Sequence, residues 1–290
     1  MLFILTTLNN NELRKIAATR LNPAESIEKM NPYPFAQNTP LLNLSAKGAI
    51  IIDADSQVVL FSKNPQLRFS MASTTKIMTA LTALDYFKSD AILTVRSAGV
   101  GGAVLGLVPG ERLTFESLLY AMLLPSANDA AVAIADNYPG GREAFIKRMN
   151  EKARSLHLSN THFADPTGLD DDENYTTVED LARLASYAIK NPDLSKATST
   201  KQKVIASLGS SKRYELNNLN KLLGTNGVTG IKTGTTEGAG EVLVTSTVEN
   251  GHTFIIVVMN STNRFADTRM LLSFISQNIR FVSPLSNLKE

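Results

Sequence analysis

A hydroxyl and an amine lie three residues apart within residues 71–81 and form a pair suited to nucleophilic chemistry. Ser73 precedes Lys76 by three positions, and apolar residues of helical spacing follow them. Residues i and i+3 share one face of a helix, so the two side chains are expected to project into the same space. A serine hydroxyl attacks when a neighbouring base takes its proton, and a lysine with a lowered pKa can be that base. The pair therefore predicts a serine nucleophile activated by lysine.

The spacing of this pair is common, and it occurs twice more in the chain. Ser26 precedes Lys29, and Ser286 precedes Lys289, by the same three positions. A serine that caps a helix and is followed by a solvated lysine gives an identical pattern. The choice between nucleophile and cap therefore depends on the rest of the sequence.

Two other short segments bear on that choice. Ser126 and Asn128 lie two residues apart, between two apolar segments with helical periodicity, where a capping serine is the plain alternative. The triplet 232–234, Lys-Thr-Gly, occurs once and ends a β-branched segment. A glycine within a strand usually marks the close approach of another backbone, and the neighbouring cation and hydroxyl can hold a carboxylate. The alternative is an edge strand with a solvated lysine.

Composition narrows the classes of function. The 290 residues are 43% hydrophobic and 19% charged with a formal net charge of +2, which is ordinary for a soluble globular protein. The sequence has no dense run of lysine and arginine, so nucleic-acid binding is not predicted. The sequence contains no cysteine, and its three histidines (His157, His162 and His252) lack zinc-type spacing. We therefore expect no metal and no cofactor.

The order of predicted elements indicates the fold class. Strands are predicted near both ends of the chain, at 49–61 and again at 227–232, 242–248 and 254–259, with helices between them and a closing helix at 267–281. Consecutive strands joined by short turns form antiparallel hairpins. The sequence therefore predicts an α+β fold, in which helices flank an antiparallel sheet formed from both chain ends. A mainly helical lobe is inserted at about 88–215.

The N-terminal part of the chain is predicted to lie outside the main domain. Closely spaced prolines at positions 32, 34 and 40 favour an extended linker. We expect residues 1–41 to form an N-terminal segment and linker, and residues 42–290 to form the catalytic domain. The apolar opening, residues 1–8, is too short to span a bilayer and lacks a basic leader, so it shows no obvious membrane anchor and no intact signal sequence. Two interpretations stay open: the remnant of a truncated signal or anchor, and a frayed or packed N-terminus.

Taken together and in this order, the three short motifs resemble those of the penicillin-recognising serine enzymes. The likeness is closest to the D-alanyl-D-alanine carboxypeptidases among the low-molecular-mass penicillin-binding proteins, and it covers roughly residues 45–282. Further matching segments are 49–54, 126–131, 160–163, 168–170 and 175–181. The resemblance implies a fold like that of β-lactamases and transpeptidases.

The resemblance also implies the catalytic roles. Ser73 would be acylated, Lys76 would accept its proton, and Ser126 would relay a proton to the leaving amine. The backbone N–H groups of Ser73 and Thr235 would form the oxyanion hole.

Substrate binding would fall to a second group of residues. Asn128 would hold both the substrate amide and the side chain of Lys76. Lys232 would raise the local positive potential and so keep Lys76 neutral. Thr233 and Thr235 would meet the terminal carboxylate, while Gly234 would let the peptide lie beside the strand.

Two features refine these expectations. Arg264 and Arg269, which follow the last strand, are both candidates for pairing with the substrate carboxylate. The segment 166–169 lacks the histidine that many relatives carry before the glycine, which we expect to change loop packing more than chemistry.

The predicted function is removal of the terminal D-alanine from peptidoglycan stem peptides through an acyl-enzyme at Ser73, on the periplasmic or cell-wall side. β-Lactams would be covalent inhibitors. A class A-like β-lactamase is the nearest alternative, but no Glu-x-x-x-Asn segment lies between Asn128 and Lys232. A DD-endopeptidase stays open. A catalytically silent wall-binding protein is the third alternative. The reactive residues argue against it, because such a protein would be free to lose any of them.

Overall fold

The computed structural model describes residues 33–97, 99–169 and 172–282. The chain divides into two compact units, of which the larger comprises residues 36–279 and the smaller comprises 1–35 with 280–290. The smaller unit contains most of strands β1 (Tyr33–Ala36) and β13 (Ile279–Val282), which pair with each other. The serine–lysine pairs at 26–29 and 286–289 lie outside the described residues, as does most of the predicted 1–41 segment. The boundary near residue 42 stays a prediction.

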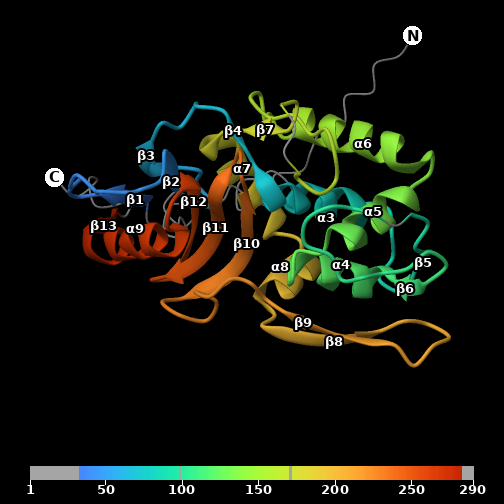
Figure 1. Cartoon of the computed structure of the whole chain (residues 1–290). Helices are drawn as coiled ribbons and strands as arrows, with labels where there is room; N and C mark the ends of the chain where they lie inside the picture. The colour runs from blue at the N-terminus through green and yellow to red at the C-terminus, as the bar shows by residue number, and fades with distance from the viewer. Residues whose placement is uncertain (1–32, 98, 170–171, 283–290) are drawn as a thin grey trace, which may run out of the picture. The chain divides into compact units, whose positions relative to one another are not determined.

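A five-stranded antiparallel sheet, in the order β10-β11-β12-β2-β3, forms the centre of the larger unit (Figure 1). Its strands are β2 (Gly48–Asp53), β3 (Val59–Lys63), β10 (Val228–Thr236), β11 (Gly240–Glu249) and β12 (His252–Ser261). Every residue of β2 is buried, which explains the unbroken apolar run at 49–52. The predicted α+β class, with a sheet drawn from both ends of the chain, is confirmed.

Helices cover both faces of this sheet (Figure 1). Helix α9 (Arg264–Asn278) packs against β11 and β12, while α7 (Val178–Ala188) packs against β12 and β2. The short 3-10 helix η1 (Ala72–Thr75) lies against the edge strand β10. The edge of the sheet therefore borders the segment that contains Ser73.

The inserted lobe is mainly helical. Its helices are α4 (Phe115–Leu123), α5 (Asn128–Asp136), α6 (Gly141–Ser155) and α8 (Pro192–Ser199). Helix α3 (Lys76–Leu84) precedes the lobe in the chain and packs against α4, α5 and α6. Short two-stranded sheets pair β4 (Phe69–Ser70) with β7 (Tyr175–Thr176), β5 (Ile92–Thr94) with β6 (Arg112–Thr114), and β8 (Gln202–Ala206) with β9 (Arg213–Asn217).

Helix α8 and the β8–β9 hairpin were not predicted from the sequence. Pro192 follows shortly after the end of α7 (Val178–Ala188) and is the first residue of α8. Proline is favoured at that position because its missing N–H is not needed there. The Asn191 side chain caps the helix by accepting from the backbone N–H groups of Asp193 and Leu194. One Asn-Pro pair thus ends one helix and starts another.

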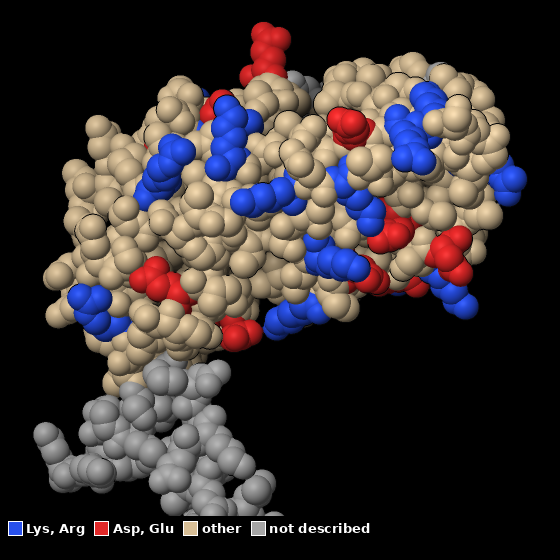
Figure 2. All heavy atoms as spheres, turned by 90° about the horizontal axis from the view of Figure 1, so that it is seen from below, with Lys and Arg blue, Asp and Glu red and all other residues tan. Residues whose placement is uncertain are grey.

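Charge is mixed on the face of the molecule shown in Figure 2, where lysine and arginine side chains lie among acidic ones without merging into one basic area. Among the described residues, no helix combines the length and apolarity needed to cross a bilayer. The same part of the chain holds no group of three or more acidic or histidine side chains arranged to bind a metal ion.

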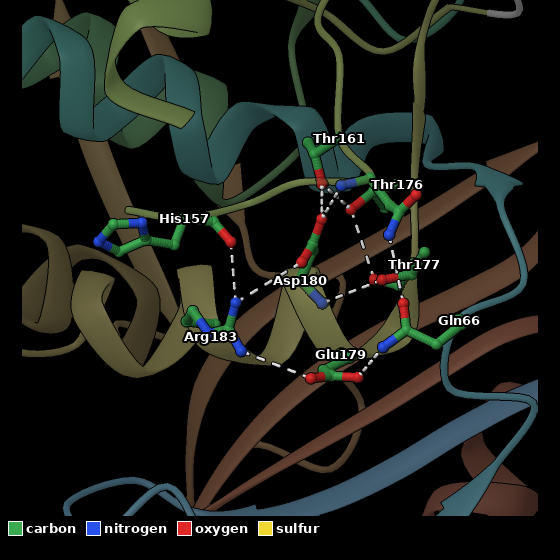
Figure 3. Close-up of polar contacts among 9 residues, drawn as sticks. Gln66, His157, Thr161, Thr176, Thr177, Glu179, Asp180 and Arg183 are labelled. Atoms are coloured by element: carbon green, nitrogen blue, oxygen red, sulfur yellow. Dashed lines mark hydrogen bonds and ion pairs between the residues drawn. The ribbon is translucent and has the colours of Figure 1, made fainter. Parts of the chain in front are cut away.

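The buried carboxylate of Asp180 links the loop at 160–161 to the start of α7 (Figure 3). Asp180, on the first turn of α7, accepts from the backbone N–H of Asn160 at 2.7 Å and from the Thr161 hydroxyl at 2.9 Å. Thr161 in turn contacts Thr176 of β7 at 2.8 Å. Because β7 pairs with β4, which ends just before η1, this network fixes the strand that leads into the nucleophile turn.

A second buried carboxylate joins the N-terminal and C-terminal parts of the chain beside two neighbouring strands of the sheet, β2 and β12. Asp267 of α9 accepts from the backbone N–H groups of Ser45 and Ala46, at 3.0 and 2.8 Å, and from the hydroxyls of Ser45 and Ser261, both at 2.7 Å. Burial alone would raise the pKa of Asp267, but these hydrogen bonds hold it below its usual value. Asp267 therefore links the segment before β2 to the end of β12 and the start of α9.

Replacing Asp267 with alanine should lower the free energy of unfolding by about 3 kcal/mol, because several buried donors would lose their acceptor. The matched control is Asp193→Ala, which removes an exposed carboxylate from the first turn of α8 and should cost under about 1 kcal/mol. Urea denaturation measures both. A group with a lowered pKa stabilises above its usual pKa and ceases to do so in acid, so the Asp267 effect should shrink as the pH falls through its folded pKa. Equal losses for both variants would contradict this role.

Candidate active site

The nucleophile turn joins β4 to α3. Ala72 has a φ of +46°, a left-handed conformation that is uncommon for a residue with a side chain. Ser73 follows it on η1 and is half-buried, and α3 starts at Lys76. The predicted helix thus begins with a 3-10 turn, which still places the hydroxyl and the amine together. Strain of this kind persists where the surroundings enforce it, most often at functional sites.

Two glycines from distant parts of the sequence, Gly168 and Gly234, pack closely against this turn. A Cβ on Gly168 would lie 1.8 Å from the carbonyl oxygen of Ala72, and one on Gly234 would lie 3.1 Å from the backbone nitrogen of Ser73. Gly234 therefore makes room for the segment that carries the nucleophile. The predicted role of Gly234, admission of a substrate peptide beside the strand, stays a prediction.

The Lys76 amine is fully buried and has three polar neighbours. Nζ lies 2.9 Å from Oγ of Ser73, 2.6 Å from Oδ1 of Asn128 and 2.6 Å from the carbonyl oxygen of Thr167. The Asn128 amide is oriented by its nitrogen, which donates to the carbonyl of Gly101 at 2.7 Å. Two of the three neighbours can therefore only accept hydrogen bonds from the amine.

This arrangement determines where a neutral Lys76 directs its lone pair. A neutral amine has two N–H groups, which the Asn128 oxygen and the Thr167 carbonyl take up. The lone pair then faces the remaining neighbour, the Ser73 hydroxyl, which can donate as well as accept. The geometry suits removal of the proton from Ser73 by Lys76.

Burial lowers the pKa of Lys76 to about 7, because the charged ammonium loses its hydration, while the negative charge of Asp165 acts in the opposite direction. A large fraction of the amine is therefore neutral near pH 7. Lys232 was expected to help keep Lys76 neutral. Burial is the largest cause of the lowered Lys76 pKa, and the effect of Lys232 on it stays a prediction. The pKa of Lys232 is itself lowered, first by burial and then by the charges of Lys76 and Arg264.

The second serine lies at the turn between α4 and α5. Ser126 has a φ of +67° and is only 4% exposed, and its Oγ accepts from Nζ of Lys232 at 3.0 Å. Helix α5 is capped at Ala127 without a side-chain hydrogen bond, so Ser126 is not a helix cap. Lys232 also donates to the carbonyl of Thr233 at 3.0 Å. The structure thus joins the second and third sequence motifs through a serine–lysine contact.

The end of β10 holds the remaining predicted residues. Thr233 is buried and Thr235 is exposed. Nη1 of Arg264 donates to the carbonyl of Gly234 at 2.6 Å and also contacts the Thr235 hydroxyl. Arg269 is exposed and lines a separate groove with Pro40 and Leu42, among others. Of the two candidate arginines, Arg264 is the one beside the predicted carboxylate-binding threonines.

Sequence reasoning missed the contribution of segment 165–168 to the site. The backbone carbonyl of Thr167 contacts Lys76, and the Asp165 carboxylate holds that turn. Aspartate followed by threonine and glycine is a typical turn signal and could have drawn attention to it. The segment expected to affect packing therefore also touches the amine. Asp170, the last residue of the matching segment 168–170, lies outside the described residues.

Comparison with known proteins places these features in a family. Residues 34–263 match the family model described as D-alanyl-D-alanine carboxypeptidase. The chain is 37% identical over 240 residues to D-alanyl-D-alanine carboxypeptidase DacF of Bacillus subtilis, a match that covers 79% of this chain and 61% of the relative. It is 34% identical over 250 residues to the D-alanyl-D-alanine endopeptidase of Pseudomonas aeruginosa, covering 83% of this chain and 80% of that protein.

The structural comparison agrees. The crystal structure of the Streptomyces K15 DD-transpeptidase matches with a TM-score of 0.77 and 31% sequence identity, covering 82% of this chain and 98% of that structure. The predicted resemblance, the fold and the enzyme class are thereby confirmed. The chain belongs to the D-alanyl-D-alanine carboxypeptidase family of serine-type hydrolases.

Proposed function

We propose that this protein removes the terminal D-alanine from peptidoglycan stem peptides, with Ser73 as the nucleophile. The observation that carries the proposal is the buried amine of Lys76, 2.9 Å from the Ser73 hydroxyl and with two acceptors for its N–H groups. Because such peptides are part of the cell wall, we place the activity on the periplasmic or cell-wall side.

Acylation follows from this geometry. Lys76 takes the proton of Ser73, and Oγ attacks the carbonyl carbon of the penultimate D-alanine. The backbone N–H groups of Ser73 and Thr235 stabilise the oxyanion. The carbon–nitrogen bond then breaks, and the proton passes through Ser126 to the amine of the departing D-alanine, which leaves an ester at Ser73.

Binding of the terminal carboxylate places the scissile bond at the nucleophile. Thr235 and the guanidinium of Arg264 lie together at the end of β10 and offer a hydroxyl and a planar pair of donors. Lys232 adds a buried amine nearby, which donates to the Ser126 hydroxyl. A free terminal carboxylate is therefore favoured over an esterified one.

Deacylation reverses the first step with water as the nucleophile. Water attacks the ester carbonyl while Lys76 accepts a proton from it, and the peptide leaves with a new carboxyl group as Ser73 regains its hydrogen. Departure of D-alanine leaves space for that water. A penicilloyl group remains tethered after its ring opens and occupies the same space.

The β-lactamase alternative requires a general base aimed at the ester. In the described part of the 165–174 segment, the Asp165 carboxylate is already occupied by Thr167, Gly168 and Asn174. This arrangement supports the carboxypeptidase. The endopeptidase reaction uses the same acyl step, and the name of the Pseudomonas aeruginosa relative keeps it as the second candidate.

Ser73→Ala should abolish both penicillin labelling and D-alanine release while the protein stays folded, because loss of a hydroxyl at a helix start costs only about 1 kcal/mol. Intact mass after incubation with benzylpenicillin, followed by peptide mapping, locates the adduct. Ser126→Ala is the control, since it keeps the nucleophile and should still be labelled, more slowly. An adduct on any serine other than Ser73 would refute the assignment.

The rate of acylation by penicillin should fall about tenfold for each pH unit below about 7 and level off above it. Lys76 must be neutral to accept the Ser73 proton, and its pKa is lowered to about 7 by burial. Stopped-flow measurement of the second-order rate constant between pH 5 and 9 tests this. A rate that keeps rising up to pH 10 would mean that an ordinary, unshifted lysine is the base.

The penicilloyl adduct should persist for minutes or longer, while an acyl-D-Ala-D-Ala peptide turns over steadily. The tethered ring blocks the water, whereas D-alanine departs and admits it. Adduct decay is followed by mass spectrometry, and release of D-alanine is compared with cleavage of a crosslinked peptide dimer. An adduct that clears within seconds would favour the β-lactamase, and cleavage of the dimer alone would favour the endopeptidase.

A further inference from the structure

Asp165 is charged, lies within the 165–168 turn, and has no part in the reaction described above. Its Oδ1 accepts from the Thr167 hydroxyl at 2.5 Å and from the backbone N–H of Gly168 at 2.8 Å, and it also contacts the backbone N–H of Thr167. Its Oδ2 accepts from the Asn174 amide at 2.8 Å. One carboxylate thus holds both sides of the turn.

This turn has little freedom on its other sides. The Thr79 hydroxyl of α3 donates to the carbonyl of Pro166 at 2.8 Å. Gly168, with a φ of +83°, lies directly against the backbone of Ala72. The carbonyl between these two anchors, that of Thr167, is the one that contacts Nζ of Lys76 at 2.6 Å. The position of that carbonyl therefore depends on these two anchors together with the hydrogen bonds of the Asp165 carboxylate.

The Thr167 carbonyl matters because it is one of the two acceptors that orient a neutral Lys76. If this acceptor moves away, an N–H of the amine can turn toward Ser73, and the lone pair no longer faces the hydroxyl. Misplacement of a reacting group by about 1 Å can lower a rate about 100-fold.

We propose that Asp165 is a positioning residue of the acylation reaction, which holds the Thr167 carbonyl against Lys76 and places a negative charge near the amine. This proposal rests on the function proposed above. Asp165 thereby favours the orientation of the neutral Lys76 amine in which its lone pair faces the Ser73 hydroxyl.

The other charged groups around Lys76 differ in sign or direction from Asp165. Lys232 of β10 interacts electrostatically with Lys76, and Arg264 of α9 interacts with Lys232. Asp129 of α5 is adjacent to Asn128, but its carboxylate accepts from the backbone N–H groups of residues 105–107. Asp165 is the charge that raises the pKa of Lys76 against the effect of burial. Removing its charge should therefore lower that pKa.

Two variants separate the position of the carbonyl from the charge. Asp165→Ala removes the hydrogen bonds that the Asp165 carboxylate accepts from Thr167, Gly168 and Asn174, and the plateau rate of acylation by benzylpenicillin should fall about 100-fold. Asp165→Asn keeps an oxygen for Thr167 and Gly168, and the Asn174 side chain can rotate to present its own oxygen to the new amide. The plateau rate should be largely restored in this variant, but the midpoint of the pH profile should move to lower pH.

Asp136→Asn is the matched control. It removes a carboxylate of the same lobe that pairs with Arg142 and does not contact the turn, and its pH midpoint should match that of the wild type. Thermal melting of each variant shows that it is folded at the assay temperature. The proposal is overturned if Asp165→Asn keeps the wild-type midpoint, or if Asp165→Ala keeps the wild-type plateau. Failure of the proposed function is distinct, because it would appear in the wild type itself: no adduct at Ser73, an adduct that clears within seconds, or cleavage of the crosslinked dimer alone.

Discussion

Burial of a single amine is the constraint on which the site depends. An ammonium taken out of water loses its hydration, and Lys76 recovers part of that loss through three short contacts. The contacts are enough to hold the side chain in place, but they leave the pKa near 7. A lysine that is neutral at physiological pH can remove a proton from serine, which an ordinary solvated lysine does poorly.

The fold supplies the partners of this amine from three separate parts of the chain. Ser73 and Lys76 come from the turn that enters α3, Asn128 comes from the start of α5, and Thr167 comes from the turn that follows α6. Strand β10 closes the arrangement, because Gly234 allows the nucleophile turn to approach it. The site therefore lies where the edge of the sheet meets the helical lobe, and both must be in place before Lys76 is fully enclosed.

Much of this could be predicted from the sequence, for identifiable physical reasons. The reactive pair shares a helical face, the strands read as apolar segments between turns, and three ordered motifs revealed the family. The contact of Thr167 with Lys76 could not be predicted, because it is made by a backbone carbonyl, which every residue type possesses. Burial, the largest cause of the lowered Lys76 pKa, could not be predicted either, because it is a property of the assembled fold. Helix α8 was missed because Pro192 signals both the end and the start of a helix.

The most direct test of this account is the pKa of Lys76 itself, measured in the folded protein. In Ser73→Ala protein labelled with ¹⁵N at the lysine side chains, the Lys76 signal can be assigned by its loss in a Lys76→Arg variant and then followed through a pH titration. The account predicts a midpoint of about 7. A midpoint near 10.5, the ordinary value for lysine, would show that the amine is charged under working conditions and would contradict its role as the base.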